Sequence, residues 1–332
     1  MKSRILFVER APSLFVSIEN VFRQIAKSLP TNRYTTDFQS VPFSNDFISV
    51  LKNLAFFRHR DADIYHVTGH VHYISLVLPK DKTVLTIHDL GFLRTRTGIR
   101  RYILKKLLLD WPIRRLSYIT TISEATKNEI VSNVKTGEDK IRIVENPLGD
   151  QYVSNGQKGF NIECPTILQL GTMENKNVPR LIRALEGIPC KLRIVGPMNV
   201  KIADELERTN VAFDNDVHLD GEQLLQAYID ADIIAFCSTF EGFGLPIIEG
   251  QAMERPVLTS NISPMREVAG DGAEFVDPLD VEDIARGINN LIRNSEHRAE
   301  LIKVGLGNAR RFNAELIAKE YETIYDEILS AK

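Results

Sequence analysis

Cysteine is scarce in this chain of 332 residues. The three cysteines, Cys164, Cys190 and Cys237, are odd in number and lack the spacing of a metal site. This excludes a small secreted domain held by disulfides and predicts a reducing compartment, the cytoplasm.

Long hydrophobic runs are absent too. No segment approaches the roughly 20 apolar residues that cross a bilayer. The apolar run near the start, Ile5–Val8, is too short for a secretory signal and is expected to be a first buried strand. An apolar content of 43% and a charged content of 26% are normal for a soluble protein, and the length suggests two domains.

Charge is divided unevenly along the chain. Residues 1–150 hold 23 Lys and Arg against 15 Asp and Glu, whereas residues 151–332 hold 18 against 29. The net charge of −3 conceals this division. The basic first half is therefore expected to meet an anionic partner.

Short β-rich runs alternate with longer amphipathic segments, which is typical of parallel sheets with helices on both faces. Helices are expected at 18–28 and 314–329, and Ser123 is expected to cap another. The predicted fold is α/β, with two doubly wound Rossmann-like domains. The strands are expected at 5–8, 63–68, 83–87, 118–122, 166–170, 191–195, 217–219, 233–236, 256–259 and 273–276.

The clearest chemical signal is the segment Phe240–Met253, in which a strand end is followed by a glycine-bearing loop and a helix. Gly242 and Gly244 let a ligand approach the backbone, and the helix start is a ready anion site. Glu241 in the loop and Glu249 one turn into the helix can face the same ligand, and a carboxylate can accept two hydrogen bonds from a ribose diol. The structural alternative is a simple strand-to-helix connection in which Glu249 complements the helix dipole.

Here the chain resembles glycosyltransferase family 4, whose E-G-F-G-L-P-x-x-E signature stands at 241–249. The resemblance continues through 256–260 and 265–271 and covers nearly the whole chain. It implies a GT-B fold with two domains facing across a cleft, a nucleotide-diphosphate sugar as donor, a retaining mechanism, and no essential cofactor or metal. It also implies that Glu241 lies beside the donor sugar, that Glu249 holds the ribose, and that the amides of Gly242, Phe243, Gly244 and Leu245 hold sugar and phosphate.

A turn-rich, weakly apolar stretch over 146–159 indicates a linker between two domains, and the resemblance gives each domain its role. Residues 1–150 are expected to form the acceptor-side domain, 151–163 a linker, and 164–312 the nucleotide-sugar-binding domain. The last segment, 313–332, is expected to be a helix that packs back on the N-terminal domain.

A second donor-side segment is Gly171–Asn177, which follows a strand and opens a helix. Lys176 resembles the family lysine that neutralises the diphosphate leaving group, and the alternative is a solvated lysine at a helix start. Many relatives have an arginine where this chain has Thr172 or Asn175, and Arg180 is a candidate to replace it. Gly196 is expected near the nucleotide base.

The N-terminal domain offers His88 and Asp89 at a strand end. His88 matches a family histidine that contacts the donor sugar, and Asp89 is expected either to orient it or to cap the strand end. His70, after an earlier strand, is expected to face the acceptor. Ser17 and Glu19 are expected beside it, although Val16 and Ser17 replace the paired glycines of many relatives.

Three Asp-x-Asp triplets occur, at 61/63, 214/216 and 230/232. Such a triplet holds the metal in another glycosyltransferase fold, where it follows a strand. Each of these is expected to precede a strand instead, so all three are interpreted as loop or cap residues.

The segment Arg94–Arg115 carries eight basic residues in 22 positions, opposed only by Asp110. Apolar and aromatic residues, including Tyr102 and Trp111, are interleaved with them. The segment predicts peripheral contact with an anionic membrane surface on its inner, cytoplasmic face, and the alternative is a solvated helix face. No nucleic-acid-binding motif accompanies it.

These features predict a hexosyltransferase that acts on a glycan or lipid-linked acceptor in the synthesis of a cell-surface polysaccharide. Two alternatives use the same donor site. One is a nucleotide-sugar epimerase of the GT-B fold, and the other is a subunit that binds a nucleotide sugar without turning it over.

Overall fold

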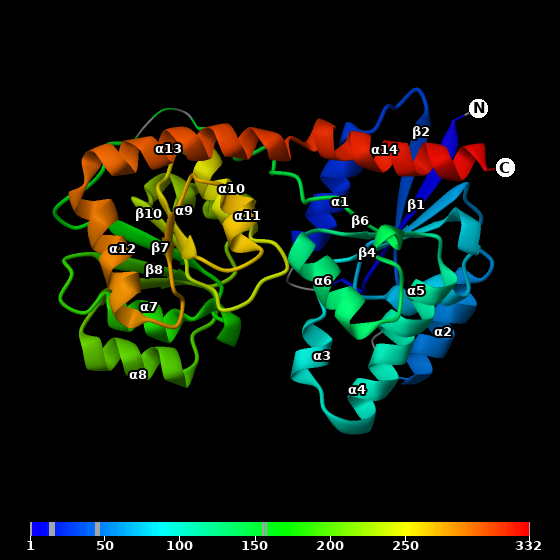
Figure 1. Cartoon of the computed structure of the whole chain (residues 1–332), viewed down its shortest axis with the longest axis horizontal. Coiled ribbons are helices and arrows are strands. Elements are labelled where there is room, and N and C mark those ends of the chain that lie inside the picture. Colours follow the sequence, from blue (N-terminus) through cyan, green and yellow to red (C-terminus); the bar gives the residue numbers. More distant parts are fainter. Residues whose placement is uncertain (1, 13–16, 44–46, 155, 157, 332) are drawn as a thin grey trace. The chain divides into compact units, whose positions relative to one another are not determined.

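The computed structural model describes residues 2–12, 17–43, 47–154, 156 and 158–331, so Val16 lies outside the described residues. The chain divides into two compact units. Unit 1 comprises residues 1–147 and 314–332, and unit 2 comprises residues 148–313. The N-terminal and C-terminal parts of the chain therefore fold together in unit 1 (Figure 1).

Unit 1 is built on a six-stranded parallel sheet with the order β2-β1-β3-β4-β5-β6. Its strands are β1 (Ser3–Glu9), β2 (Tyr34–Ser40), β3 (Ile64–Val67), β4 (Thr83–Ile87), β5 (Tyr118–Thr121) and β6 (Ile141–Ile143). Its helices are α1 (Ser17–Ser28), α2 (Phe47–Phe57), η1 (His72–Leu76), η2 (Lys80–Lys82), α3 (Gly91–Thr95), α4 (Gly98–Lys105), the π-helical turn η3 (Lys106–Asp110), α5 (Trp111–Arg115), α6 (Glu124–Asn133), η4 (Glu138–Lys140) and α14 (Ala314–Ser330). Ser123 caps α6 by accepting a hydrogen bond from the Thr126 amide, as its sequence position predicted.

The two faces of this sheet have different cores. One face packs Leu6, Val8 and Leu85 against apolar side chains of α2, η3 and α5. The other face is covered by α1 and α14, which pack against each other, and there Phe7 contacts Phe22. The alternation along β1 follows from the two-residue period of a strand, which turns neighbouring side chains to opposite faces.

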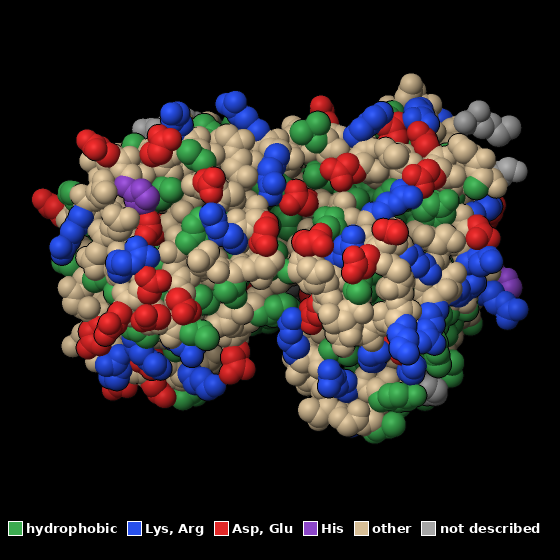
Figure 2. All heavy atoms as spheres, in the orientation of Figure 1, with side chains coloured by type: hydrophobic (Ala, Val, Ile, Leu, Met, Phe, Trp, Pro, Cys, Tyr) green, Lys and Arg blue, Asp and Glu red, His purple; other side chains and the backbone are tan. Residues whose placement is uncertain are grey.

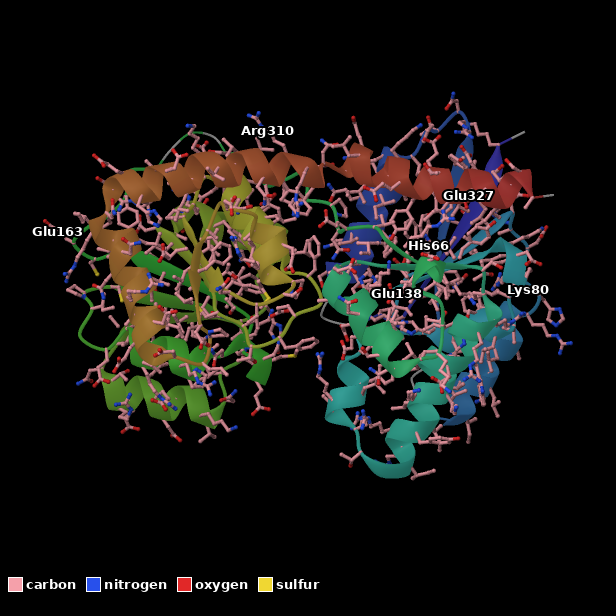
Figure 3. The ribbon with its side chains drawn as sticks, in the orientation of Figure 1. His66, Lys80, Glu138, Glu163, Arg310 and Glu327 are labelled. Atoms are coloured by element: carbon pink, nitrogen blue, oxygen red, sulfur yellow. The ribbon has the colours of Figure 1, made fainter. Side chains whose placement is uncertain are left out.

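A buried polar cluster attaches α14 to the sheet. His66 on β3 lies within unit 1 (Figure 3), and its ring nitrogens are 2.7 Å from the hydroxyls of Tyr325 and Thr86. Thr86 also lies 3.3 Å from the Tyr321 hydroxyl. Because a buried polar group without a partner is costly, these bonds favour one register of α14 on the sheet.

Unit 2 repeats the architecture with the order β12-β11-β10-β7-β8-β9, all parallel. Its strands are β7 (Thr166–Leu170), β8 (Lys191–Val195), β9 (Ala212–Asp216), β10 (Ile233–Phe236), β11 (Val257–Ser260) and β12 (Glu274–Val276). Its helices are η5 (Glu174–Lys176), α7 (Val178–Ala184), α8 (Val200–Thr209), α9 (Gly221–Asp230), α10 (Leu245–Ala252), α11 (Met265–Ala269), α12 (Val281–Arg293), α13 (Ser295–Ala309) and η6 (Arg310–Phe312). The predicted α/β class with two Rossmann-like domains is confirmed.

The strand expected at 217–219 is wrong. The strand lies earlier, at Ala212–Asp216, and His218 has a φ of 61°, which a strand does not allow. As the edge of the sheet, β9 tolerates a polar sequence, and Asp214 and Asp216 pair with Lys191 and Arg193 of β8. The triplet 214/216 therefore lies within a strand rather than before one.

Candidate active site

The donor-side residues of unit 2 gather where the order of the sheet reverses. In that sheet β7 lies between β10 and β8, so the chain leaves β7 toward one side and β10 toward the other. The loops that follow two such strands diverge and leave room for a ligand at their carboxyl ends. The segment 171–177 follows β7, and the segment 237–244 follows β10.

An ion pair joins these two loops. The ammonium nitrogen of Lys176 lies 2.7 Å from Oε1 of Glu241, and both side chains are largely withdrawn from solvent. The amide of Asn175 donates to the same oxygen at 3.1 Å and to the Phe240 carbonyl at 2.9 Å. Lys176 also lies over the ring of Phe236. The structure thus brings Lys176 and Glu241 together, and Asn175 braces them.

Two glycines make this arrangement possible. Gly171 has a φ of 82°, and a β-carbon there would stand 3.1 Å from Cε of Lys176, so a larger residue would displace the lysine. Gly244 has a φ of 128° and precedes α10, whose start has no side-chain cap in the described structure. The first amides of α10 therefore present the positive end of the helix dipole, which suits a diphosphate.

Glu249 lies in the second turn of α10, beside two packed phenols. Tyr228 of α9 donates a hydrogen bond to its Oε2, and Tyr152 packs edge to face against Tyr228 and helps to lower the pKa of the carboxyl group. Burial raises the pKa of Glu249 to about 7, against the opposing effects of the Tyr228 and Tyr152 hydrogen bonds and the charge of Lys176. A carboxyl group with such a pKa changes its charge near neutral pH.

The other residues expected on the donor side make contacts within unit 2. The Thr172 hydroxyl donates to the Pro197 carbonyl, beside Gly196, whose φ is 137°. Arg180 donates to the side chain of Asn177 at 2.8 Å rather than to Glu241. The ring of Phe243 is buried against Phe312, with centroids 5.7 Å apart. Only the backbone of Phe243 is therefore suited to ligand contact.

In unit 1 the order of the sheet reverses between β1 and β3. His88, just after β4, is buried, and its Nε2 donates to the Thr68 carbonyl at 2.9 Å. Burial lowers the pKa of His88 to about 3, so the ring is neutral at pH 7. A neutral ring suits hydrogen bonding to a sugar hydroxyl better than carrying a proton.

Asp89 and His70 lie beside this histidine. The Asp89 carboxylate accepts a hydrogen bond from the Gly91 amide at 2.7 Å and lies 3.8 Å from Nε2 of His70. The His70 and His88 rings are 6.4 Å apart. Asp89 therefore binds the first amide of α3, while the Thr68 carbonyl contacts His88.

The two residues expected near the first loop differ in setting. Ser17 is exposed at the start of α1. Glu19 forms a two-point ion pair with Arg10, at 2.7 and 3.1 Å. Gly69 packs against the backbone of Arg10, where a β-carbon would stand 2.8 Å from the Arg10 nitrogen.

Sequence reasoning missed Asn175 as a brace and Tyr152 and Tyr228 as partners of Glu249. Asn175 adjoins Lys176 and was interpreted only as a replaced arginine. The tyrosines lie far from Glu249 in the sequence, so no local pattern could have indicated them. Among the described residues, no three His, Cys, Asp or Glu side chains are grouped to hold a metal ion.

Comparison with known proteins gives the family. Residues 153–306 match the family described as Glycosyl transferases group 1, and residues 19–150 match Glycosyltransferase Family 4. The chain belongs to glycosyltransferase family 4. These two matches cover most of both units of the glycosyltransferase.

Individual relatives agree with this assignment. The O-antigen chain mannosyltransferase B of Escherichia coli is 26% identical over 264 residues, which are 71% of this chain and 68% of that protein. The serotype-specific mannosyltransferase WbdA of Escherichia coli is 24% identical over 74% of this chain, which spans about a third of that protein (34%). The crystal structure of Anabaena Alr3699/HepE in complex with UDP and glucose is 15% identical, with a TM-score of 0.78 and coverage of 99% and 100%. The structural likeness supports the GT-B fold.

Proposed function

We propose that this chain is a retaining hexosyltransferase that moves a hexose from a nucleotide-diphosphate sugar to a glycan or lipid-linked acceptor during the synthesis of a cell-surface polysaccharide. The observation that carries the proposal is the Lys176–Glu241 pair, 2.7 Å apart, at the reversal point of the unit 2 sheet. The mannosyltransferase names of the relatives and the UDP and glucose bound to the Anabaena protein support a hexose and a nucleotide donor.

The proposed chemistry assigns each group a role. The start of α10 and Lys176 stabilise the negative charge that develops on the diphosphate as the sugar–phosphate bond breaks. Glu241 contacts the donor sugar and holds Lys176 in place, and Glu249 accepts hydrogen bonds from the ribose. His88 contacts the sugar, and the departing diphosphate takes up the proton of the incoming acceptor hydroxyl on the same face of the sugar. The bond to the acceptor thus forms where the bond to phosphate breaks, and the anomeric configuration is retained.

A thermal-shift panel of nucleotide sugars, including GDP-mannose and UDP-glucose, is the first experiment. One donor is expected to raise the melting temperature of the protein and to be hydrolysed slowly without an acceptor. Release of an epimerised nucleotide sugar from donor alone would favour the epimerase instead. Binding without hydrolysis or transfer to any glycan acceptor would favour the inactive subunit.

We also propose that the basic segment 94–115 lies on an anionic membrane surface. Ile99, Tyr102 and Trp111 are 70%, 58% and 48% exposed. Figure 2 shows basic and apolar side chains together over this part of unit 1. Some of the charge is already engaged, because Lys105 and Lys106 both pair with the buried Asp110. The exposed cations of the segment are Arg94, which pairs with Glu129, and Arg96, Arg100, Arg101 and Arg114.

None of the described helices combines the length and apolar character needed to cross a bilayer. Membrane contact is tested by flotation with phosphatidylserine-containing vesicles. Each exposed cation contributes about 1 kcal/mol near such a surface, so a double charge reversal at Arg100 and Arg101 is expected to abolish flotation. Lys303→Glu, an exposed reversal in unit 2, is the control. Equal flotation of both variants would refute membrane contact through this segment.

A further inference from the structure

Glu249 is enclosed by two tyrosines that come from different parts of unit 2. Tyr228, in the last turns of α9, is fully buried, and its hydroxyl donates to Oε2 of Glu249. Tyr152, in the segment that enters unit 2, is 5% exposed, and its hydroxyl helps to lower the pKa of the Glu249 carboxyl group. The two rings pack edge to face, with centroids 5.2 Å apart at 74°. The carboxyl group is therefore hydrogen-bonded to one buried phenol, and the second phenol packs against the first.

The chemistry of these phenols restricts what they can do for Glu249. Burial is the main cause that raises the pKa of both tyrosines well above the ordinary value, so both hydroxyls keep their protons at neutral pH. Each hydroxyl can therefore donate to the carboxylate. An ionised carboxylate has about four acceptor positions, so two tyrosines leave positions for a ligand. A protonated carboxyl group would use one oxygen as a donor and lose part of that capacity.

We propose that Tyr228 and Tyr152 are positioning residues, which hold Glu249 as a carboxylate that accepts from both vicinal hydroxyls of a ribose. This inference rests on the proposed function, since it takes the nucleotide of the donor as the ligand of Glu249. It assigns the two tyrosines a role in donor selectivity in addition to their place in the core.

The protonation of Glu249 gives the inference a pH dependence. Burial raises the pKa of Glu249 to about 7, and the groups that act against this are Tyr228, Tyr152 and Lys176. Lys176 is itself paired with Glu241. Because ribose hydroxyls donate to the ionised form, binding is strongest above about pH 7 and weakens as the pH falls. Removing a tyrosine hydroxyl removes a hydrogen bond that favours ionisation, so this weakening should begin at a higher pH.

The experiment measures binding of UDP, GDP and their 2′-deoxy counterparts by calorimetry between pH 5.5 and pH 8.5. The wild-type protein is expected to prefer the ribonucleotide by about tenfold at high pH, as expected for a hydrogen bond to a charged group, and to lose this preference below pH 7. In Tyr228→Phe the midpoint of this loss should move to higher pH. Tyr152→Phe, which also keeps its ring, should move it in the same direction. In Glu249→Gln the preference should be small at every pH.

Tyr321→Phe is the matched control, because Tyr321 is an equally buried phenol that bonds to Thr86 in unit 1. It should leave the midpoint unchanged, whatever it does to stability. An unchanged midpoint in both Tyr228→Phe and Tyr152→Phe would overturn this inference alone. Failure of the wild-type protein to bind any of these nucleotides would overturn the proposed function, and the inference with it.

Discussion

The two units share a six-stranded parallel sheet but place different chemistry at its carboxyl edge. In unit 2 the edge holds a charged pair, Lys176 and Glu241, in contact across two loops. In unit 1 it holds His88, a buried neutral histidine, with His70 and Asp89 nearby. Preorganised charge suits a diphosphate, whereas neutral hydrogen-bonding groups suit sugar hydroxyls. The contrast supports a donor role for unit 2 and a hydroxyl-binding role for unit 1.

A fall in pH should have the largest effect, because it should lower the stability of unit 1 more than that of unit 2. Burial lowers the pKa of His66 to about 3, of His72 to about 4 and of His88 to about 3, all in unit 1. Between these values and about pH 6.5 the unfolded chain binds protons that the folded unit does not, so stability falls as the pH falls. At pH 5 each of these histidines is expected to lower the free energy of unfolding by about 2 kcal/mol, or about 6 kcal/mol together.

Trp111 is the single tryptophan and lies in unit 1, so its fluorescence during urea unfolding reports on that unit. The urea midpoint should fall between pH 7.5 and pH 5.5. Glu249 in unit 2 acts in the opposite sense, because a raised carboxyl pKa stabilises the fold at low pH and this contribution is lost as the pH rises through about 7. The exposed His59 serves as a control, since His59→Ala should leave the acid response unchanged. Equal midpoints at both pH values would contradict the prediction.

Loss of the charge at Lys176 should have the next largest effect, measured on activity. Lys176→Ala is expected to lower turnover about 10²–10³-fold, since the proposed function places this cation at the leaving group. The measurement is the initial rate of sugar transfer at saturating donor. Lys201→Ala is matched, because Lys201 is 76% exposed and pairs with an exposed glutamate, Glu174. Similar rates for the two variants would show that Lys176 takes no part in catalysis.

A side chain added where α10 packs closely against the sheet should have a smaller effect, a moderate loss of stability. A β-carbon at Gly250 would stand 2.8 Å from Cγ1 of Ile234 on β10 and 3.1 Å from Val257 on β11. Gly250→Ala is therefore expected to cost about 1–3 kcal/mol through overpacking. Gly137→Ala in unit 1, where a β-carbon meets nothing within 4 Å, should change stability little. Calorimetric melting of both variants checks this, and an equally stable Gly250→Ala would show that α10 can shift.

The sequence indicated the two segments that meet in unit 2 for a physical reason. The site of unit 2 is built from two continuous segments, 171–177 and 240–253, that follow strands adjacent in the sheet. A local pattern can therefore indicate both. The tyrosines behind Glu249 and the cluster of His66 with α14 depend on packing between distant segments, which no local pattern records.

Strand prediction failed for a related reason. Buried central strands such as β7 and β10 are apolar and were predicted with correct bounds. The edge strands β2, β6, β9 and β12 have fewer neighbours to bury them. Among them β12 was predicted to within one residue, but β2 and β6 were not predicted. β9 was misplaced because its exposed residues pair with charges on β8 and give no apolar pattern.

The smallest effect should come from the exposed pair that joins β6 to α14. Arg142 and Glu327 form two hydrogen bonds of 2.8 and 2.7 Å, but their side chains are 43% and 41% exposed. Glu327 lies on α14, as does Tyr325, the buried partner of His66 (Figure 3). Solvent screens such a pair, so a double-mutant cycle with Arg142→Ala and Glu327→Ala should give a coupling energy below about 1 kcal/mol. The coupling should shrink further in 1 M salt.

The same cycle made between His66 and Tyr325 should give a larger coupling energy that salt leaves unchanged, because that pair is buried. Since both pairs attach α14 to the same sheet, the difference isolates burial from position in the fold. A salt-insensitive coupling above about 2 kcal/mol for Arg142 and Glu327 would mean that surface ion pairs hold α14 in place. Unit 1 would then depend on paired charge as unit 2 does at its active site, and the contrast between the two units would be lost.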